Sequence, residues 1–268
     1  MGLAAALTGA AERGQYRIAV PEVGITAIVA PNVTLVGATR FLGLSAEIME
    51  AWKTDASGDG AELLLEAAGR SCYQSWHNPA GRTNHEYIAS IIRQGHGSVL
   101  EHADYSLYLR GVSRALTHEL VRHRAGCSYS QLSQRYVDSS DIAFVVPPAL
   151  MGDDSLLEVW AEACRASLAA YVRLVEGLDE RIADRKRKRE CARAVLPNCA
   201  ETHIVMTANV RAWRHILALR GSEHADAEIR RLMAVILGVL SDTVPLFRDY
   251  VTEAGSDGVP VVRVVAEE

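Results

Sequence analysis

The chain has 268 residues and a formal net charge of −5, and 49% of its residues are hydrophobic and 23% charged. These proportions are typical of a globular protein rather than a disordered one, and the acidic balance argues against a surface that coats nucleic acid. No apolar run approaches the ~18 residues that span a bilayer, and the Ala-rich start lacks the basic residues of a signal peptide. We therefore expect a cytoplasmic protein that binds neither nucleic acid nor membrane.

The first half of the chain contains weakly and strongly patterned segments. Residues 1–32 are interpreted as an N-terminal extension, partly disordered or carrying one or two edge strands, and residues 33–268 as a single domain. Residues 61–68 predict a short helix with three leucines on its buried side, followed by a loop over 72–82. Thr83 and Glu86 form a capping box that opens a helix ending at Gly95. Alternating apolar residues over 105–110 predict a strand.

The second half continues without a regular strand–helix–strand rhythm. Ser113 is expected to cap a helix that ends near Gly126, residues 142–146 form a strand, and Asp153 or Asp154 caps a long helix to 178. The basic run 185–189 is interpreted as the solvated end of a helix, in preference to a nucleic-acid patch. A strand over 204–207 and helices over 211–219 and 224–240 complete the set. This order favours an α+β fold over a doubly wound sheet.

The basic residues are unusually uneven. Of 28, three are Lys (Lys53, Lys186, Lys188), so 25 are Arg. On composition alone codon bias, which also raises Ala and Gly, is the favoured explanation of this excess; the functional alternative is that Arg, unlike Lys, grips carboxylate or phosphate bidentately. The five cysteines lack a CxxC pair, which predicts neither a disulfide framework nor a zinc site.

The densest polar stretch is residues 122–136. Arg122 and Arg124 fall at the end of a predicted helix, where cations favourably meet the helix dipole without any ligand. Gln131, Ser133 and Arg135 are spaced by two, so they share one face if the segment is extended, and together they would suit a phosphate or carboxylate. Both interpretations stay open on the residues alone.

Smaller polar clusters lie elsewhere. Arg211 and His215 are four apart on one helical face, and Arg220 directly precedes Gly221 at a helix end. On these residues alone, an ordinary amphipathic helix with charged outer residues is the favoured interpretation. The turn 96–102 carries two histidines and an acid, and Arg193 stands alone beside apolar sequence. His118 and His123 resemble a zinc-protease signature, but their spacing of five places them on different faces.

No glycine-rich phosphate loop occurs, since neither GxGxxG nor GxxxxGK[ST] is present. A nucleotide would therefore be held by arginines and hydroxyls. None of the cysteines has a sequence context that marks it as a nucleophile.

Four motifs together resemble the flavin-dependent thymidylate synthase family. Arg-His-Arg at 122–124, eight intervening residues and Ser-Gln-Arg at 133–135 match the family's long signature. Gly-His-Gly-Ser-Val-Leu-Glu-His at 95–102, Ala-Arg-Ala-Val-Leu-Pro at 192–197, and the segment 209–224 match further blocks in the same order. The resemblance covers roughly residues 33–250. It implies an α+β fold with a mixed or antiparallel sheet flanked by helices.

The resemblance also implies an activity. Such enzymes are methyltransferases that convert dUMP to dTMP, with the methylene from 5,10-methylenetetrahydrofolate and the hydride from reduced FAD, which NADPH recharges. They are homotetramers whose active sites are shared between subunits. The implied catalytic residues are Arg220, His96 and Ser133. The implied FAD contacts are Ser98, Glu101, Arg122, His123, Arg124, Gln131, Asn209, Val210, Arg211 and His215, with His224 a weaker candidate. The implied dUMP contacts are Glu119, Leu120, Val121, Arg122, Gln131, Leu132, Ser133, Gln134, Arg135, Arg193 and Arg220.

The implied chemistry uses no cysteine nucleophile. Arg220 is expected to stabilise negative charge on the uracil as N3 loses its proton. One departure concerns the loop between the two halves of the signature, which has one residue more than the commonest form. The extra residue is expected to bulge the loop at 125–127, whereas a register slip would displace Gln131, Ser133 and Arg135.

Two other function classes remain as alternatives. A non-catalytic nucleotide- or RNA-binding protein could use the same arginine clusters, and it would show salt-sensitive RNA binding. A family-shaped protein made inactive by the extra loop residue would bind FAD without turnover.

Overall fold

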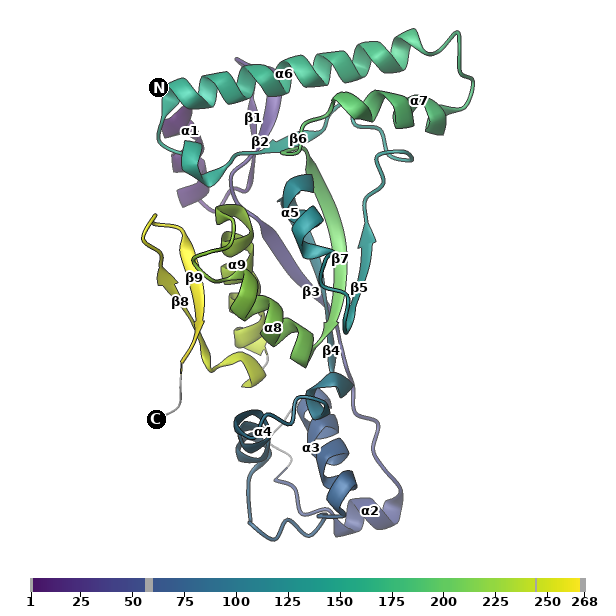
Figure 1. Cartoon of the computed structure of the whole chain (residues 1–268), viewed down its shortest axis with the longest axis vertical. Coiled ribbons are helices and arrows are strands. Elements are labelled where there is room, and N and C mark those ends of the chain that lie inside the picture. Colours follow the sequence, from purple (N-terminus) through teal and green to yellow (C-terminus); the bar gives the residue numbers. More distant parts are fainter. Residues whose placement is uncertain (1, 56–59, 244, 266–268) are drawn as a thin grey trace.

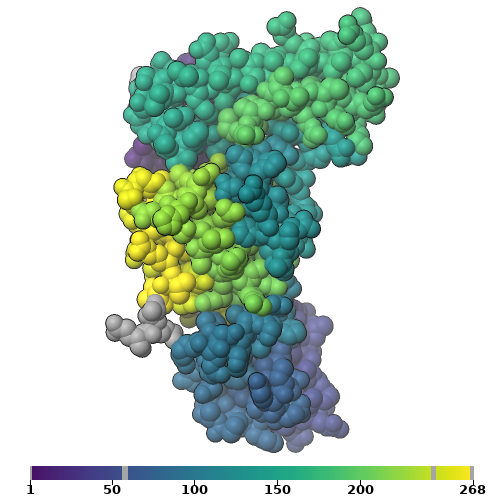
Figure 2. Space-filling model, viewed as in Figure 1, coloured from purple at the N-terminus to yellow at the C-terminus, as the bar shows by residue number. Residues whose placement is uncertain are grey.

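The computed structural model describes residues 2–55, 60–243 and 245–265. Figure 1 shows an elongated molecule with three regions along its longest axis, and Figure 2 shows the same division on the surface. A sheet with its covering helices lies in the middle. A long helix with the N-terminal elements lies at one end, and a small helical region lies at the other.

The middle sheet is antiparallel throughout. Its strand order is β3-β4-β7-β5. The bounds are β3 Asn32–Ala38, β4 Asp104–Ser113, β5 Cys127–Gln131 and β7 Glu201–Asn209. The alternation that predicted the strand at 105–110 is confirmed, since Tyr105, Leu107 and Leu109 are buried. β4 and β7 pair along their length, with Leu107 opposite Met206.

Helices pack around this sheet and hold the main hydrophobic core. They are α5 Arg114–Leu120, α8 Val210–Arg220 and α9 Ala227–Thr243. Ser113 caps α5 as predicted, because its side chain accepts a hydrogen bond from the Leu116 amide. The predicted end near Gly126 was wrong: α5 stops at Leu120, where the Arg122 and His123 amides instead close tight turns. Trp213 of α8 is fully buried and donates to the Tyr105 carbonyl oxygen.

A second layer lies at the N-terminal end. It contains α1 Leu3–Glu12, β1 Arg17–Val20, β2 Ile25–Ile28, β6 Ala143–Val145 and α6 Asp154–Gly177. β2 pairs antiparallel with β1 and parallel with β6. The Ala-rich helix α1 was not predicted; its Leu7 packs in a core with Phe144 and Leu157. Asp153 caps α6, and Asp154 accepts from the Ala4 amide, which ties the starts of α1 and α6 together.

The basic run over 185–189 lies at the start of a helix that leads toward Pro197, as expected for the solvated end of such a helix. α7, Arg185–Ala192, is capped by Asp184, whose side chain accepts from the Lys186 amide. Cations at a helix start oppose its dipole, but nearby acids compensate. Lys188 pairs with Asp179, and Arg189 lies 3.1 Å from Asp138.

The small helical region comprises α2 Ala46–Ala51, α3 Gly60–Tyr73 and α4 Asn84–Arg93. The capping box of Thr83 and Glu86 is confirmed at the start of α4. The helix predicted over 61–68 is present within α3, but the expectation that its three leucines share the buried side was wrong, because consecutive residues cannot share a helical face. Its buried stripe instead includes the charged residues Glu62, Glu66 and Arg70.

The chain finishes with a hairpin that the sequence did not reveal. β8, Tyr250–Ala254, and β9, Pro260–Val264, pair antiparallel, and β9 packs on α9. None of the helices in the described ranges is both long and apolar enough to cross a bilayer.

Candidate functional site

The first polar group is the Arg220 cluster, made of Arg220, Glu119 and His123. It joins the end of α8 to the end of α5 and the turn that follows. The Arg220 guanidinium donates from Nη1 to Glu119 Oε2 at 2.8 Å and from Nε to His123 Nε2 at 2.9 Å. Since Nε2 accepts this bond, His123 must be the neutral tautomer with its proton on Nδ1. The cluster thus fixes the orientation of a permanent cation at a helix end.

The surroundings shift the pKa values of both partners of Arg220, His123 and Glu119. Burial lowers the pKa of His123, and the charges of Arg220 and His215 lower it further. Burial also raises the pKa of Glu119, with Asp226 adding to the rise and Arg220 opposing it. His215 of α8 is exposed, and its ring lies edge-on to His123 with centroids 5.9 Å apart.

The turn at residues 122–126 presents two cations. Arg122 and Arg124 are both exposed. The Cys127 amide donates to the Arg124 carbonyl oxygen, and Gly126 has a φ of +68°. A Cβ on Gly126 would come within 2.4 Å of the Asn209 side chain. Only glycine therefore fits the turn.

β5 begins at Cys127, inside the long signature that carries the extra residue. From Cys127 to Gln131 the strand pairs with β7 without any register shift. The expected shared face of Gln131, Ser133 and Arg135 was wrong, however. The strand ends at Gln131, and the Tyr136 and Val137 amides donate to the Ser133 carbonyl oxygen, so the chain turns there.

The second group, the β5-end group, consists of Gln131–Arg135 with Arg114 and Arg193. Gln131 Nε2 donates to Thr117 Oγ1 at 2.9 Å, which holds it against α5. Arg114 was missed by sequence reasoning, although it directly follows the cap of α5. Its Nη1 donates to the Leu132 carbonyl oxygen at 3.5 Å. Burial lowers the Arg114 pKa, and the charge of Arg193 lowers it further, so two cations lie close together.

Within this group, single side chains differ in their freedom. Gln134 is buried, and its Nε2 has no hydrogen-bond partner among the described residues. Arg135 lies 3.9 Å from Glu190 of α7, at an exposed site where an ion pair contributes little. The group therefore offers amide and guanidinium N–H donors from which an anion could accept hydrogen bonds.

The third group is the 96–101 turn with the start of α8. Glu101 and Arg211 form an ion pair of 2.6 Å, and both are exposed. A Cβ on Gly97 would lie 3.1 Å from Arg211 Nε, so glycine lets the turn approach that side chain closely. Asn209 caps α8 by accepting from the Ala212 amide. His96 and Ser98 are exposed beside this pair.

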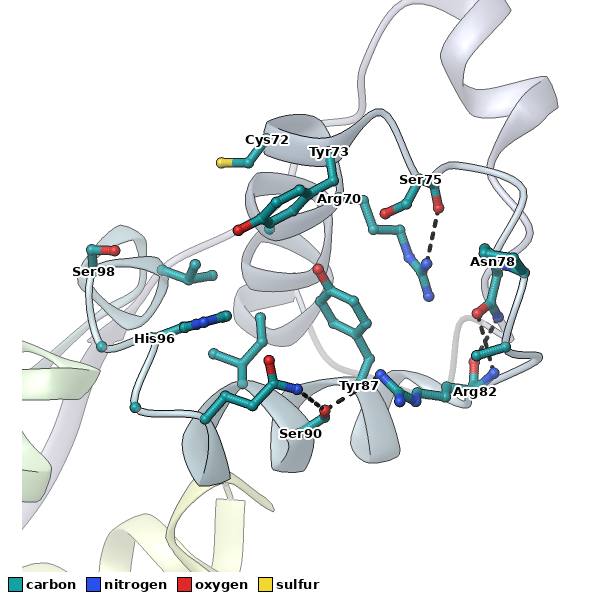
Figure 3. A pocket seen from close by; sticks show the side chains of 18 of the residues that line it. Arg70, Cys72, Tyr73, Ser75, Asn78, Arg82, Tyr87, Ser90, His96 and Ser98 are labelled. Carbon is teal, nitrogen blue, oxygen red and sulfur yellow. Dashed lines mark hydrogen bonds between the residues drawn. The ribbon is translucent and has the colours of Figure 1, made fainter.

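A cavity of about 750 Å³ opens next to this turn. Figure 3 shows it between α3, α4 and the 96–98 turn, with Tyr73, Tyr87, His96 and Ser98 around it. Its size suits a small organic ligand.

Two of the ligand contacts expected from the sequence have side chains that a ligand cannot reach. Leu120 and Val210 are fully buried in the core. A ligand could reach these residues only through their backbone. Val121 is half-buried, and His224 is exposed near the start of α9. No group of three or more His, Cys, Asp or Glu side chains that could hold a metal ion occurs in the part of the chain that the structure describes.

Comparison with known proteins shows the family to which this chain belongs. Residues 54–246 match the family model described as thymidylate synthase complementing protein. A flavin-dependent thymidylate synthase of Mycolicibacterium vanbaalenii is 50% identical over 244 residues, which cover 87% of this chain and 95% of that protein. The chain belongs to the flavin-dependent thymidylate synthase family. A relative of the same name from Mycobacterium avium is also 50% identical over 244 residues.

Solved structures agree with the family's fold. The UMP/dUMP methylase PolB from Streptomyces cacaoi, bound with 5-Br dUMP, has a TM-score of 0.62 at 23% identity and covers 82% of this chain and 94% of its own. At this identity the likeness concerns the fold alone. The resemblance drawn from the four motifs is therefore confirmed, as is the α+β class with antiparallel sheets flanked by helices.

Proposed function

We propose that this protein is a flavin-dependent thymidylate synthase. It converts dUMP to dTMP, takes the methylene from 5,10-methylenetetrahydrofolate and uses FAD, recharged by NADPH, as the hydride source. The relatives at 50% identity carry this name over nearly their whole length. The structural observation that carries the proposal is the Arg220 cluster, where a guanidinium is held by Glu119 and a neutral His123.

The residues present fit a flavin dinucleotide. Arg122 and Arg124 are exposed cations on one tight turn, and they suit the two charges of a pyrophosphate. Gly126 and Gly97 keep the backbone close to Asn209 and Arg211, both proposed FAD contacts. Ser98, Glu101, His123, Gln131, Val210 and His215 complete the proposed FAD set. When bound, the flavin supplies the hydride that reduces the transferred methylene.

The β5-end group suits the phosphate of dUMP. Ser133, Gln134, Arg135 and Arg193 offer hydroxyl, amide and guanidinium donors, and Gln134 Nε2 lacks a protein partner among the described residues. Glu119, Leu120, Val121, Arg122, Gln131, Leu132 and Arg220 complete the proposed dUMP set. A bidentate guanidinium is the strongest donor available for such an anion.

Arg220 is the proposed catalytic cation. As uracil N3 loses its proton, negative charge spreads over the ring, and a fixed guanidinium stabilises that charge without reorganising. His96 and Ser133 are the other proposed catalytic residues. A cysteine is not required: burial raises the pKa of the Cys127 thiol, which disfavours the nucleophilic thiolate.

The proposed assembly is a homotetramer with active sites shared between subunits. In one chain the proposed ligand contacts fall into three groups, at the end of α8, at the end of β5 and at the 96–101 turn, which suits completion by neighbouring subunits. Light scattering of the purified protein tests this point: a monomer would contradict it. We further propose that the enzyme acts in the cytoplasm on small molecules and binds neither nucleic acid nor membrane.

The experiment that tests the activity is tritium release from [5-³H]dUMP. Release should require FAD, NADPH and 5,10-methylenetetrahydrofolate together. Binding of FAD with no release at any substrate concentration would indicate an inactive member of the family. Salt-sensitive RNA binding without release would favour the non-catalytic alternative.

A further inference from the structure

A buried ion pair includes Arg70, which lines the cavity beside His96. Glu66 and Arg70 of α3 are 0% and 2% exposed, and Arg70 Nε donates to Glu66 Oε1 at 2.6 Å. Glu66 also accepts hydrogen bonds from Trp52 Nε1, Thr54 Oγ1 and Asn84 Nδ2. The carboxylate is thus fully occupied by protein donors. A buried ion pair is costly to desolvate, so these contacts fix the Arg70 guanidinium in place.

Arg70 has more donors than the protein uses. Nη1 donates to the Ser75 carbonyl oxygen at 3.0 Å, but Nη2 is buried and has no hydrogen-bond partner among the described residues. The guanidinium lies 4.4 Å from the centre of the Tyr87 ring. A ring face attracts the cation but provides no acceptor in the plane of Nη2. A buried charged donor without an acceptor is energetically costly, so Nη2 calls for an acceptor.

A second guanidinium lies on the same wall. Arg82 Nη1 donates to Ser90 Oγ at 3.3 Å. Ser90 and Tyr87 are three residues apart on α4, so they are neighbours on one helical face. Arg82 and Arg70 therefore contact adjacent side chains, and Figure 3 shows both guanidinium groups at the same end of the cavity, near Asn78.

The charged residues of the cavity wall also favour an anionic ligand. Three arginines and His96 line the cavity, and its lining contains no Asp or Glu. Two guanidinium groups that line one space can both donate hydrogen bonds to an anion placed between them. Tyr73, Tyr87 and His96 provide flat rings along the rest of the wall.

We propose that the Arg70–Arg82 end of this cavity is a subsite for the anionic group of a co-substrate. The ligand would be an elongated molecule whose ring system lies toward His96 and whose carboxylate or phosphate lies between the two arginines. This inference rests on the proposed function, because two of its co-substrates have that shape. The glutamate of the folate carries carboxylates, and NADPH carries a ribose phosphate; the shared chemistry is an anion at the end of a ring-bearing chain.

Direct binding to the FAD-loaded enzyme separates the two sources. One arm titrates p-aminobenzoylglutamate, which carries only carboxylates, and the other titrates adenosine 2′,5′-bisphosphate, which carries only phosphates. Calorimetry should detect one of them in the wild type and a loss of affinity of about tenfold in Arg82→Gln, which corresponds to ~1.4 kcal/mol. The probe that binds identifies the co-substrate.

Two further variants sharpen the test. Arg93→Gln removes an exposed arginine from the same helix outside the cavity lining, and it should bind the probe like the wild type. Arg70→Lys keeps the positive charge beside Glu66 but removes the Nη2 donor, and this variant should bind the probe about three- to tenfold more weakly than the wild type. Thermal unfolding checks that each variant is folded.

The corresponding kinetic result is a raised KM for that co-substrate with little change in kcat. A folate analogue without glutamate, or NADH in place of NADPH, should abolish the difference between Arg82→Gln and the wild type. Failure of both probes to bind, or unchanged binding in Arg82→Gln, would overturn the subsite. Tritium release by the wild type is measured separately, so loss of the proposed function is told apart from loss of the subsite.

Discussion

Replacing Arg220 with Gln separates the catalytic role of this cation from its structural role. Its guanidinium makes charge-assisted hydrogen bonds to Glu119 and His123, and each such bond contributes roughly 1.5–3 kcal/mol. Arg220 is 19% exposed and Glu119 26%, so water can partly solvate the carboxylate that loses its partner. We therefore expect the free energy of unfolding to fall by about 2–3 kcal/mol.

That loss cannot explain a large loss of turnover. A domain of ordinary stability unfolds with about 5–15 kcal/mol, so a loss of 3 leaves more than about 95% of the chain folded. Removal of a preorganised charge from a developing anion costs about 10²–10³ in kcat. Arg220→Gln should thus retain its flavin absorbance while tritium release from [5-³H]dUMP falls at least 100-fold.

Arg214 of the same helix provides the matched control. It pairs with Asp249 through two hydrogen bonds of 2.7 and 2.5 Å and also donates to the Leu246 carbonyl oxygen. It is 12% exposed, so Arg214→Gln should lower stability at least as much as Arg220→Gln. It faces the C-terminal hairpin, and turnover per folded chain should stay within about threefold of the wild type. Equal turnover in the two variants would refute the reasoning.

Three further predictions concern single residues. Cys127→Ala should keep turnover within about threefold of the wild type in the tritium assay, whereas complete loss with an intact fold would restore a cysteine nucleophile. The His123 ring should titrate below the usual histidine pKa in NMR of the flavin-free protein, because burial and Arg220 disfavour its cation. Because the unfolded chain binds this proton more readily than the folded chain, the free energy of unfolding should fall as the pH drops from the unfolded-state pKa of His123 toward its lower folded-state pKa. A ring pKa at or above the ordinary histidine value would contradict this prediction. Thr83→Ala should lower the free energy of unfolding in urea by about 0.5–2 kcal/mol, since it removes the cap on the Glu86 amide; no change would show that the capping box adds nothing.

Sequence patterns over a few residues correctly predicted the helix caps and the strand that depend on interactions between near neighbours. The caps at Thr83 and Ser113 follow from side-chain chemistry over three residues, and both are present. The strand at 105–110 follows from alternation of burial. The buried stripe of α3 was missed, because the Glu66 carboxylate is buried against Trp52 and Asn84, which lie outside α3, 14 and 18 residues away.

The candidate site was only partly predictable for the same reason. Motif spacing drew attention to Arg220 and Glu119, but their contact joins residues 101 positions apart and depends on how α8 packs beside α5. The face assumed for Ser133 and Arg135 required an extended chain, and a turn at Ser133 removes that condition. Arg114 carried no motif and became visible only beside Arg193.

The central claim is tested most directly by tritium release from [5-³H]dUMP in the purified wild-type protein, with and without added FAD. Release should depend on FAD, on NADPH and on 5,10-methylenetetrahydrofolate, and omission of any one should reduce it to background. Absence of release from a flavin-loaded, folded protein supplied with all three would contradict the proposed activity.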